Sequence, residues 1–193
     1  MSAACDRAGG HRALIGLGAN LPFNDQSPAA TLRAALHALD ATPGIRVLSC
    51  SSLWQSRPVR ALGPDFINAA AEIETQLDPE SLLEHLLQIE ASFGRHRPPQ
   101  REAQETSPAR TLDLDLLWMD GLSISLPHLT VPHPRVASRA FVLAPLAELR
   151  PALCLQKDDQ APTIEHLLAQ ALREDPYAVT RMTTMTSDHV TAH

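Results

Sequence analysis

Leucine and aspartate alternate in the run Leu112–Trp118, which reads LDLDLLW. In a β-strand successive side chains point to opposite faces, so the leucines would pack on one side of a sheet. Asp113 and Asp115 would project together from the other side, with Cα atoms roughly 6.6 to 7 Å apart. The alternation therefore predicts a strand with one packing face and one acidic face.

The acidic face has two interpretations. A half-exposed strand with a polar outer surface is one of them. Aspartate is disfavoured in strands, however, and like charges this close cost free energy unless a cation compensates them. Mg²⁺ binds hard oxygen ligands, commonly one or two carboxylates together with substrate phosphates. Asp113 and Asp115 are therefore candidate ligands for Mg²⁺.

Compensating positive charge lies in the loop before this strand, which carries Arg95, Arg97, Arg101 and Arg110. Arginine binds phosphate oxygens with two parallel hydrogen bonds. Carboxylates that hold metal beside arginines suit phosphoryl transfer, whose catalysis is mainly positioning and neutralisation of charge. The sequence contains neither a Walker A motif nor a kinase glycine-rich loop. A transfer of this kind would use a different framework.

Hydrophobic periodicity places the acidic strand in an α+β chain. Strands are predicted over 13–20, 45–56 and 65–76, and helices over 28–41 and 78–94. The order strand, helix, strand, strand, helix, strand is typical of a ferredoxin-like βαββαβ core in an α/β sandwich. A turn, a short helix and an apolar segment over 129–149, followed by a helix over 164–172, would form a C-terminal extension.

The length of 193 residues favours one domain, which we place at 13–172, between a flexible N-terminus, 1–12, and a flexible tail, 173–193. The three cysteines are widely spaced and form no CxxC motif, which is typical of a reducing cytoplasm. The net charge of −6 argues against a nucleic-acid partner. No run of about 18 apolar residues predicts a membrane span. We expect a cytoplasmic monomer that acts on small molecules.

Six fragments, read together, carry a family resemblance. They are SSLWQSRPV, GPDFINAA, the turn Gly94–Arg97, ARTLDLDLLW, LTVPHPR and SRAFVLAPLAEL. In this order they resemble the 6-hydroxymethyl-7,8-dihydropterin pyrophosphokinases of folate biosynthesis, from about Ala13 to Leu149. The resemblance implies a ferredoxin-like sandwich. It also implies an enzyme that transfers the β,γ-diphosphate of ATP to the pterin hydroxymethyl group and releases AMP.

The resemblance implies roles for individual residues. Asp113 and Asp115 would hold two Mg²⁺ ions that bridge the ATP phosphates, and with Arg95 and Arg110 they would form the catalytic set. The pterin would contact Ser56, Phe66, Asn68 and Phe141. ATP would contact Arg95, Arg97, Arg110, Leu116, Thr130, His133 and Arg139. Glu90 matches the end of a family helix, although a solvated helix face explains this residue equally well.

The sequence departs from the family pattern before the acidic strand. Family members usually have a Trp-Gly-Pro-Arg-like run there, whereas this chain has Ser107-Pro108-Ala109-Arg110 in a longer loop. Two other functions fit parts of the pattern. One is a different DxD metal-dependent nucleotidyl or sugar transferase, which would not need Phe66, Asn68 and Phe141 to converge. The other is a ferredoxin-like RNA-binding module, which would need exposed aromatic residues on a basic sheet.

Overall fold

The protein is represented by a computed structural model that describes residues 10–58, 63–95, 109–156, 158 and 160–182. The predicted phosphate contact of Arg97, the neighbouring Arg101 and the altered run at 107–108 lie outside these residues. No helix in the described ranges is both long and apolar enough to cross a membrane.

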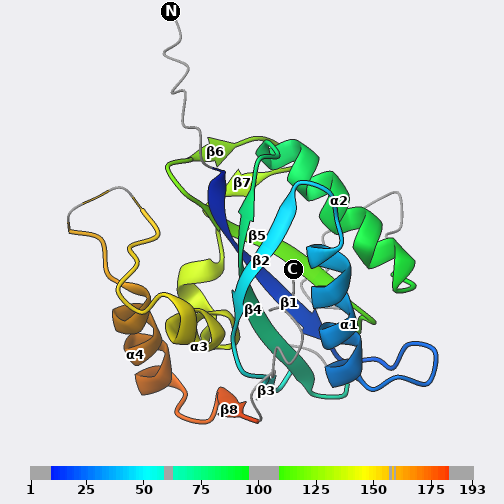
Figure 1. Cartoon of the computed structure of the whole chain (residues 1–193). Helices are drawn as coiled ribbons and strands as arrows, with labels where there is room; N and C mark the ends of the chain where they lie inside the picture. Colours follow the sequence, from blue (N-terminus) through cyan, green and yellow to red (C-terminus); the bar gives the residue numbers. More distant parts are fainter. Residues whose placement is uncertain (1–9, 59–62, 96–108, 157, 159, 183–193) are drawn as a thin grey trace, which may run out of the picture.

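Strands and helices follow one another along the described chain as drawn in Figure 1. They are β1 (His11–Ala19), α1 (Pro28–Asp40), β2 (Ile45–Cys50), β3 (Trp54–Ser56), β4 (Phe66–Thr75), α2 (Pro79–Ser92), β5 (Asp113–Met119), β6 (Ile124–Ser125), β7 (Thr130–Val131), α3 (Ala140–Leu149), α4 (Ile164–Glu174) and β8 (Val179–Arg181), with a short 3₁₀ turn at Val136–Ser138. Ser27 caps α1 and Asp78 caps α2, each through its side-chain oxygen.

The described strands of the main sheet pair antiparallel in the order β5-β1-β4-β3-β8, and β2 also pairs with β4. β4 is long enough to pair with β2 along one half and with β3 along the other. The long strand β1 therefore lies between β4 and β5, and any side chains that these two strands direct to the same face lie on either side of β1.

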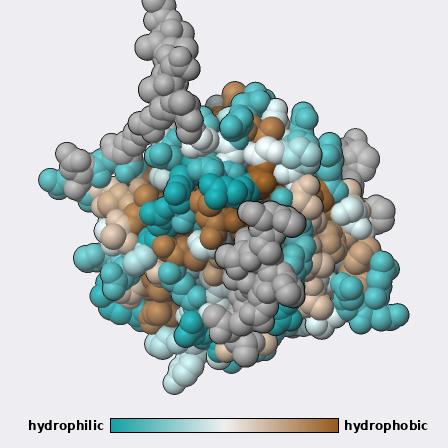
Figure 2. Space-filling view, viewed as in Figure 1, coloured by the Kyte–Doolittle hydropathy of each residue, from teal (hydrophilic) through white to brown (hydrophobic). Residues whose placement is uncertain are grey.

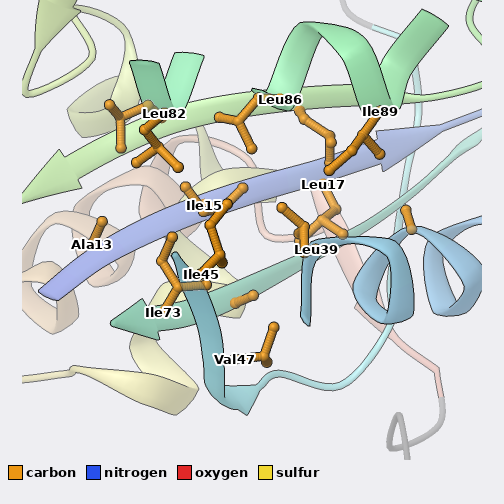
Figure 3. Close-up of a cluster of buried hydrophobic side chains, with 14 of the residues drawn as sticks. Ala13, Ile15, Leu17, Leu39, Ile45, Val47, Ile73, Leu82, Leu86 and Ile89 are labelled. Atoms are coloured by element: carbon orange, nitrogen blue, oxygen red, sulfur yellow. The ribbon is translucent and has the colours of Figure 1, made fainter. Parts of the chain in front are cut away.

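Each face of the sheet is covered by a separate apolar core. Figure 3 shows leucines and isoleucines of α1 and α2, such as Leu39, Leu82 and Leu86, packed over Ile15 of β1 and Ile73 of β4. On the opposite face, α3 and α4 cover a second cluster. Its buried members are Leu14, Ala70, Leu117, Val136, Leu143, Leu146, Leu155 and Ile164. The protein is thus a sheet between two helical layers (Figure 1).

The strand predicted over 45–56 is instead two strands, β2 and β3. Between them Ser51 is buried, and its Oγ accepts a hydrogen bond of 2.9 Å from the Ala70 N–H while donating to the Ser52 carbonyl oxygen. The serine side chain replaces the regular ladder there, so the strand breaks although its pattern is continuous.

Strands extend past both predicted ends of the domain, residues 13 and 172. β1 begins at His11, two residues before the predicted strand, and β8 lies within the predicted tail, where it pairs with β3. These ends are ordered because the neighbouring strands β4 and β3 offer them hydrogen bonds along the sheet.

The face viewed in Figure 2 mixes hydrophilic and hydrophobic residues, so hydropathy alone does not locate a site on it.

Gly94 ends α2 in a left-handed conformation that side chains rarely adopt, with φ of 75°. A Cβ there would lie 2.6 Å from Cε2 of Phe23, whose ring packs against Phe93. We expect Gly94→Ala to lower the free energy of unfolding by about 2 kcal/mol in urea denaturation, because strain and overlap add. Gly121→Ala is the matched control. Its φ is 74°, and no described atom outside its chain neighbours lies within 4 Å of an added Cβ. Equal losses in the two variants would show that Phe23 does not restrict this turn.

Candidate functional site

A pocket opens on the α3 side of the sheet, where β1, β3, β4, β5 and α3 meet. β1 supplies its floor through Gly16 and Gly18, which pair across to Asp115 and Asp113 of β5. Gly18 also pairs with Asn68 of β4, and a Cβ on this glycine would come within 3.5 Å of Asn68 Oδ1. The two glycines therefore keep the floor free of side chains between a carboxylate wall and an amide wall.

The structure brings most of the predicted site residues into this one pocket. Its lining includes Ser56, Phe66, Asn68, Arg110, Asp113, Asp115, Arg139 and Phe141. Arg95 contacts the pocket indirectly, through Asp113. Residues separated by more than eighty positions in the sequence thus share one cavity, as the resemblance implied.

Asp113 is held by two arginines. Arg95 Nη1 donates to its Oδ1 and Arg110 Nη1 donates to its Oδ2, both in short contacts. Arg95 Nη1 also lies 3.0 Å from the Leu112 carbonyl oxygen. The first carboxylate of the pair is therefore fixed in position by the ends of the loop that precedes β5.

Asp115 has a different environment. Burial, and after it the neighbouring Asp113 carboxylate, raise the pKa of Asp115 to about 6. The arginines beside Asp113 oppose this shift without cancelling it. A further positive charge in the pocket, beyond those of the arginines, would stabilise the ionised form of Asp115. This is the electrostatic condition that favours a bound cation.

Glu90 is buried, with 1% of its surface exposed, so the interpretation of this residue as part of a solvated helix face is wrong. Its Oε1 accepts a hydrogen bond of 2.8 Å from the Leu114 N–H and lies 3.0 Å from Arg95 Nη1. The side chain joins the last turn of α2 to β5 and to the arginine that holds Asp113. Only its position at the end of the amphipathic helix hinted at this role.

Asn20 is a site residue that sequence reasoning missed. Its side-chain Oδ1 accepts from the Arg110 N–H at 2.7 Å, and its Nδ2 donates to the Pro64 carbonyl oxygen at 3.1 Å. The backbone N–H groups of Asn20 and Leu21 both donate to the Arg110 carbonyl oxygen. This buried amide joins the end of β1 to the segments that precede β4 and β5. The sequence signal that could have identified Asn20 is its position directly after a strand that contains two glycines.

The wall opposite the carboxylates is polar at its base and aromatic above it. Asn68 Nδ2 donates to Ser56 Oγ at 3.0 Å and to the Trp54 carbonyl oxygen at 3.3 Å. Phe66 and Phe141 reach the pocket from β4 and α3. The guanidinium carbon of Arg139 lies 5.5 Å from the centre of the Phe141 ring, within cation–π range.

Besides Arg95, three predicted ATP contacts in the described ranges are not among the pocket-lining residues. Leu116 packs with Leu112 and Leu114 into the core on the other face of the sheet, and the alternation of β5 directs Leu117 to the pocket side with the two aspartates. Thr130 lies in β7. The His133 N–H donates to the Leu117 carbonyl oxygen at 2.8 Å, which holds this residue beside β5. Burial, followed by the charges of Arg139 and Arg135, lowers the pKa of His133.

The pocket offers carboxylate oxygens as ligands for a metal ion. Among the described residues, no group of three or more His, Cys, Asp and Glu side chains is arranged to hold one. Two carboxylates directed into one pocket nevertheless suit Mg²⁺, which commonly takes one or two protein carboxylates and completes its coordination with water and phosphate oxygens. The residues present therefore fit Mg²⁺ bound together with a phosphorylated substrate.

A family model described as 7,8-dihydro-6-hydroxymethylpterin-pyrophosphokinase (HPPK) matches residues 14–151. The chain belongs to this family. A relative from Methylorubrum extorquens is 38% identical over 172 residues, which cover 89% of this chain and 98% of the relative. A relative from Synechocystis is 40% identical over 142 residues, which cover 73% of this chain and 67% of the relative. Both are named 2-amino-4-hydroxy-6-hydroxymethyldihydropteridine pyrophosphokinase.

Solved structures of HPPK-DHPS proteins share the fold. An HPPK-DHPS in complex with substrates superposes with a TM-score of 0.66 at 12% identity, covering 90% of this chain and 47% of that one. A Plasmodium falciparum HPPK-DHPS gives a TM-score of 0.65 at 14% identity, and the superposition covers 92% of this chain and 50% of that chain. This chain thus spans about half the length of those chains, and at these identities the similarity concerns the fold alone.

Membership of the HPPK family confirms the predicted enzyme class. The chain is a diphosphokinase of folate biosynthesis, acting on the hydroxymethyl-dihydropteridine named in its relatives. The family match decides against a sugar transferase and against an RNA-binding module. The pocket agrees with this outcome, because glycines and carboxylates rather than a row of aromatic side chains line the sheet face beneath it.

Proposed function

We propose that this HPPK-family chain transfers the β,γ-diphosphate of ATP to the hydroxymethyl oxygen of 6-hydroxymethyl-7,8-dihydropterin and releases AMP. The hydroxyl oxygen attacks the β-phosphorus in line, the bond from that phosphorus to the α,β-bridging oxygen breaks, and the hydroxyl proton leaves. No covalent enzyme intermediate is required. The observation that carries the proposal is the convergence of two carboxylates with Phe66, Asn68 and Phe141 in one pocket.

Asp113 and Asp115 are the proposed ligands of two Mg²⁺ ions. When bound, Mg²⁺ neutralises charge on the phosphate chain and helps to hold it in line for attack. Arg95 and Arg110 keep Asp113 oriented in the described structure and are also the proposed contacts to phosphate oxygens at this end of the pocket. Arg139 and His133, with Thr130 and the backbone at Leu116, are the other proposed ATP contacts in the described ranges. Arg97 is a further proposed contact from outside them.

The pterin is proposed to lie between the rings of Phe66 and Phe141. Asn68 donates both of its described hydrogen bonds through Nδ2, so its Oδ1 is oriented to accept from the N–H groups of the pterin edge. Ser56 completes this wall. Aromatic faces on both sides and a fixed amide at the edge suit a flat heterocycle that carries hydrogen-bond donors.

The strand order and the helices between the strands support a finer description, a ferredoxin-like βαββαβ core followed by a C-terminal extension. We assign residues 13–172 to one pyrophosphokinase domain, to which β8 adds an edge strand. Cys50 and Cys154 are not joined to each other by a disulfide, which suits the proposed cytoplasmic location. The proposed active form is a monomer, for which the described residues of one chain suffice to supply the glycine floor, the carboxylate wall and the amide wall of the pocket.

Calorimetric titration of 6-hydroxymethyl-7,8-dihydropterin tests this function. We expect binding when Mg²⁺ and a non-hydrolysable ATP analogue are both present, and little heat when either is omitted. Phe66→Ala should weaken pterin binding about tenfold through lost aromatic contact and leave nucleotide binding unchanged. Mg²⁺-dependent nucleotide binding without any pterin binding would contradict the proposed substrate.

A further inference from the structure

The structure contains a second group of buried and charged side chains, where α3 and β8 meet the segment that leads into β3. Glu148, near the end of α3, accepts a hydrogen bond of 2.7 Å from the Ser52 N–H and one of 3.2 Å from Trp54 Nε1. Its other contact is an ion pair of 2.9 Å with Arg181 Nε of β8. We refer to Glu148, Arg181 and the Ser52–Trp54 segment that they hold as the β3 clamp.

Arg181 binds two partners of the clamp at once. Besides Glu148, it reaches Ser52 Oγ, with an Nη2 to Oγ distance of 2.9 Å, and Ser52 itself is 1% exposed. The next residue, Met182, donates its N–H to the Leu53 carbonyl oxygen at 2.8 Å. The C-terminal strand and α3 therefore hold the three residues that lead into β3 from two sides.

β3 needs such support because it is short and determines how Asn68 is presented. It spans three residues, between β4 on one side and β8 on the other. A strand of only three residues has few hydrogen bonds to hold its position. Both described partners of Asn68 Nδ2, the Trp54 carbonyl oxygen and Ser56 Oγ, belong to β3. A displacement of β3 would therefore reorient the Asn68 amide.

The clamp also connects two walls of the pocket, the one formed by α3 and the one formed by β3. Glu148 lies two turns after Phe141 on the same helix, so the contacts of Glu148 to Ser52 and Trp54 anchor α3 against β3. Phe141 lines one side of the pocket and Ser56 lines another. The anchor at Glu148 therefore acts on the position of Phe141 through two turns of α3, which include Pro145.

We infer that Glu148 and Arg181 are positioning residues for the pterin, acting through β3 and α3 without touching the substrate. The inference rests on the proposed function, since it assigns the Asn68 and Phe141 walls to the pterin. It gives the C-terminal strand β8 a role in substrate affinity. Because the β5 carboxylates and the arginines that hold Asp113 lie on the opposite wall, the clamp should affect the pterin more strongly than the nucleotide.

Steady-state kinetics of Arg181→Ala and Glu148→Gln test the inference. We expect the KM for the pterin to rise about three- to tenfold, with kcat and the KM for ATP within about twofold of the wild type, because only ground-state positioning is lost. The double variant should be no worse than the poorer single variant, since both changes break the same clamp. Arg181 is exposed, so its removal leaves the core intact.

Arg46→Ala is the matched control, because Arg46 forms a cross-strand ion pair of 2.5 Å with Glu74 at the far end of β4. This variant should keep the wild-type KM for the pterin. An unchanged pterin KM in Arg181→Ala, an equal rise in Arg46→Ala, or a fall in kcat at constant KM would each overturn the inference. A wild-type chain that forms no AMP in response to pterin would instead overturn the proposed function.

Discussion

Asp115→Asn should lower kcat about a thousandfold or more while the protein becomes more stable at neutral pH. The loss of activity follows from the proposed role of Asp115 as a metal ligand, since an amide supplies no negative charge to bind Mg²⁺. Steady-state assays of AMP release at saturating Mg²⁺ measure this loss. Asp120→Asn is the control, because Asp120 lies at the other end of β5 and faces a separate cleft.

The gain in stability follows from the raised pKa of Asp115, about 6 against an ordinary 3.8. A raised carboxyl pKa stabilises the folded state while the group is protonated, and this contribution is lost as pH rises through about 6. Asparagine stays neutral, so the variant should exceed the wild type by on the order of 1 to 3 kcal/mol at pH 7.5 and match it near pH 4. Urea denaturation at the two pH values measures this difference.

The same titration affects metal binding. Protons compete for Asp115, so Mg²⁺ and nucleotide binding to the wild type should weaken as pH falls below about 6. Near-normal turnover in Asp115→Asn would rule out the metal role. A variant that is inactive and also less stable than the wild type at pH 7.5 would show that the carboxylate contributes to folding instead.

Glu90→Ala should produce the largest loss of stability, about 3 kcal/mol in urea denaturation. The substitution leaves the Leu114 N–H without its side-chain acceptor and takes a buried negative charge away from Arg95. Removing one partner of a buried ion pair typically costs several kcal/mol, because the other charge stays buried. We also expect kcat to fall, since Arg95 holds Asp113.

Two variants make this result interpretable. Glu84→Ala changes an exposed glutamate of the same helix and should alter stability by less than about 0.5 kcal/mol. Glu90→Gln keeps an oxygen for the Leu114 N–H and should fold even if the alanine variant does not. A loss below about 1 kcal/mol in Glu90→Ala would show that α2 and β5 hold their positions without this side chain.

Local periodicity explains why much of the fold could be predicted. The two-residue alternation of β5 places Asp113 and Asp115 on one face whatever the sheet contains, and the caps Ser27 and Asp78 act through backbone groups two to three residues away. The family motifs added the aromatic residues of the pocket. The altered run before β5 marks where this chain departs from that pattern.

The amino-acid sequence by itself determined the acidic face of β5, the alternation of strands and helices, and the residue types gathered for phosphate and pterin. Tertiary structure alone decided that Glu90 is buried, that Asn20 joins three segments and that Glu148 meets Trp54. The reason is physical. Periodicities of two and 3.6 residues depend only on residues close together in the sequence. Trp54 and Glu148 are separated by 94 positions, and they come into contact only when the sheet and both helical layers assemble.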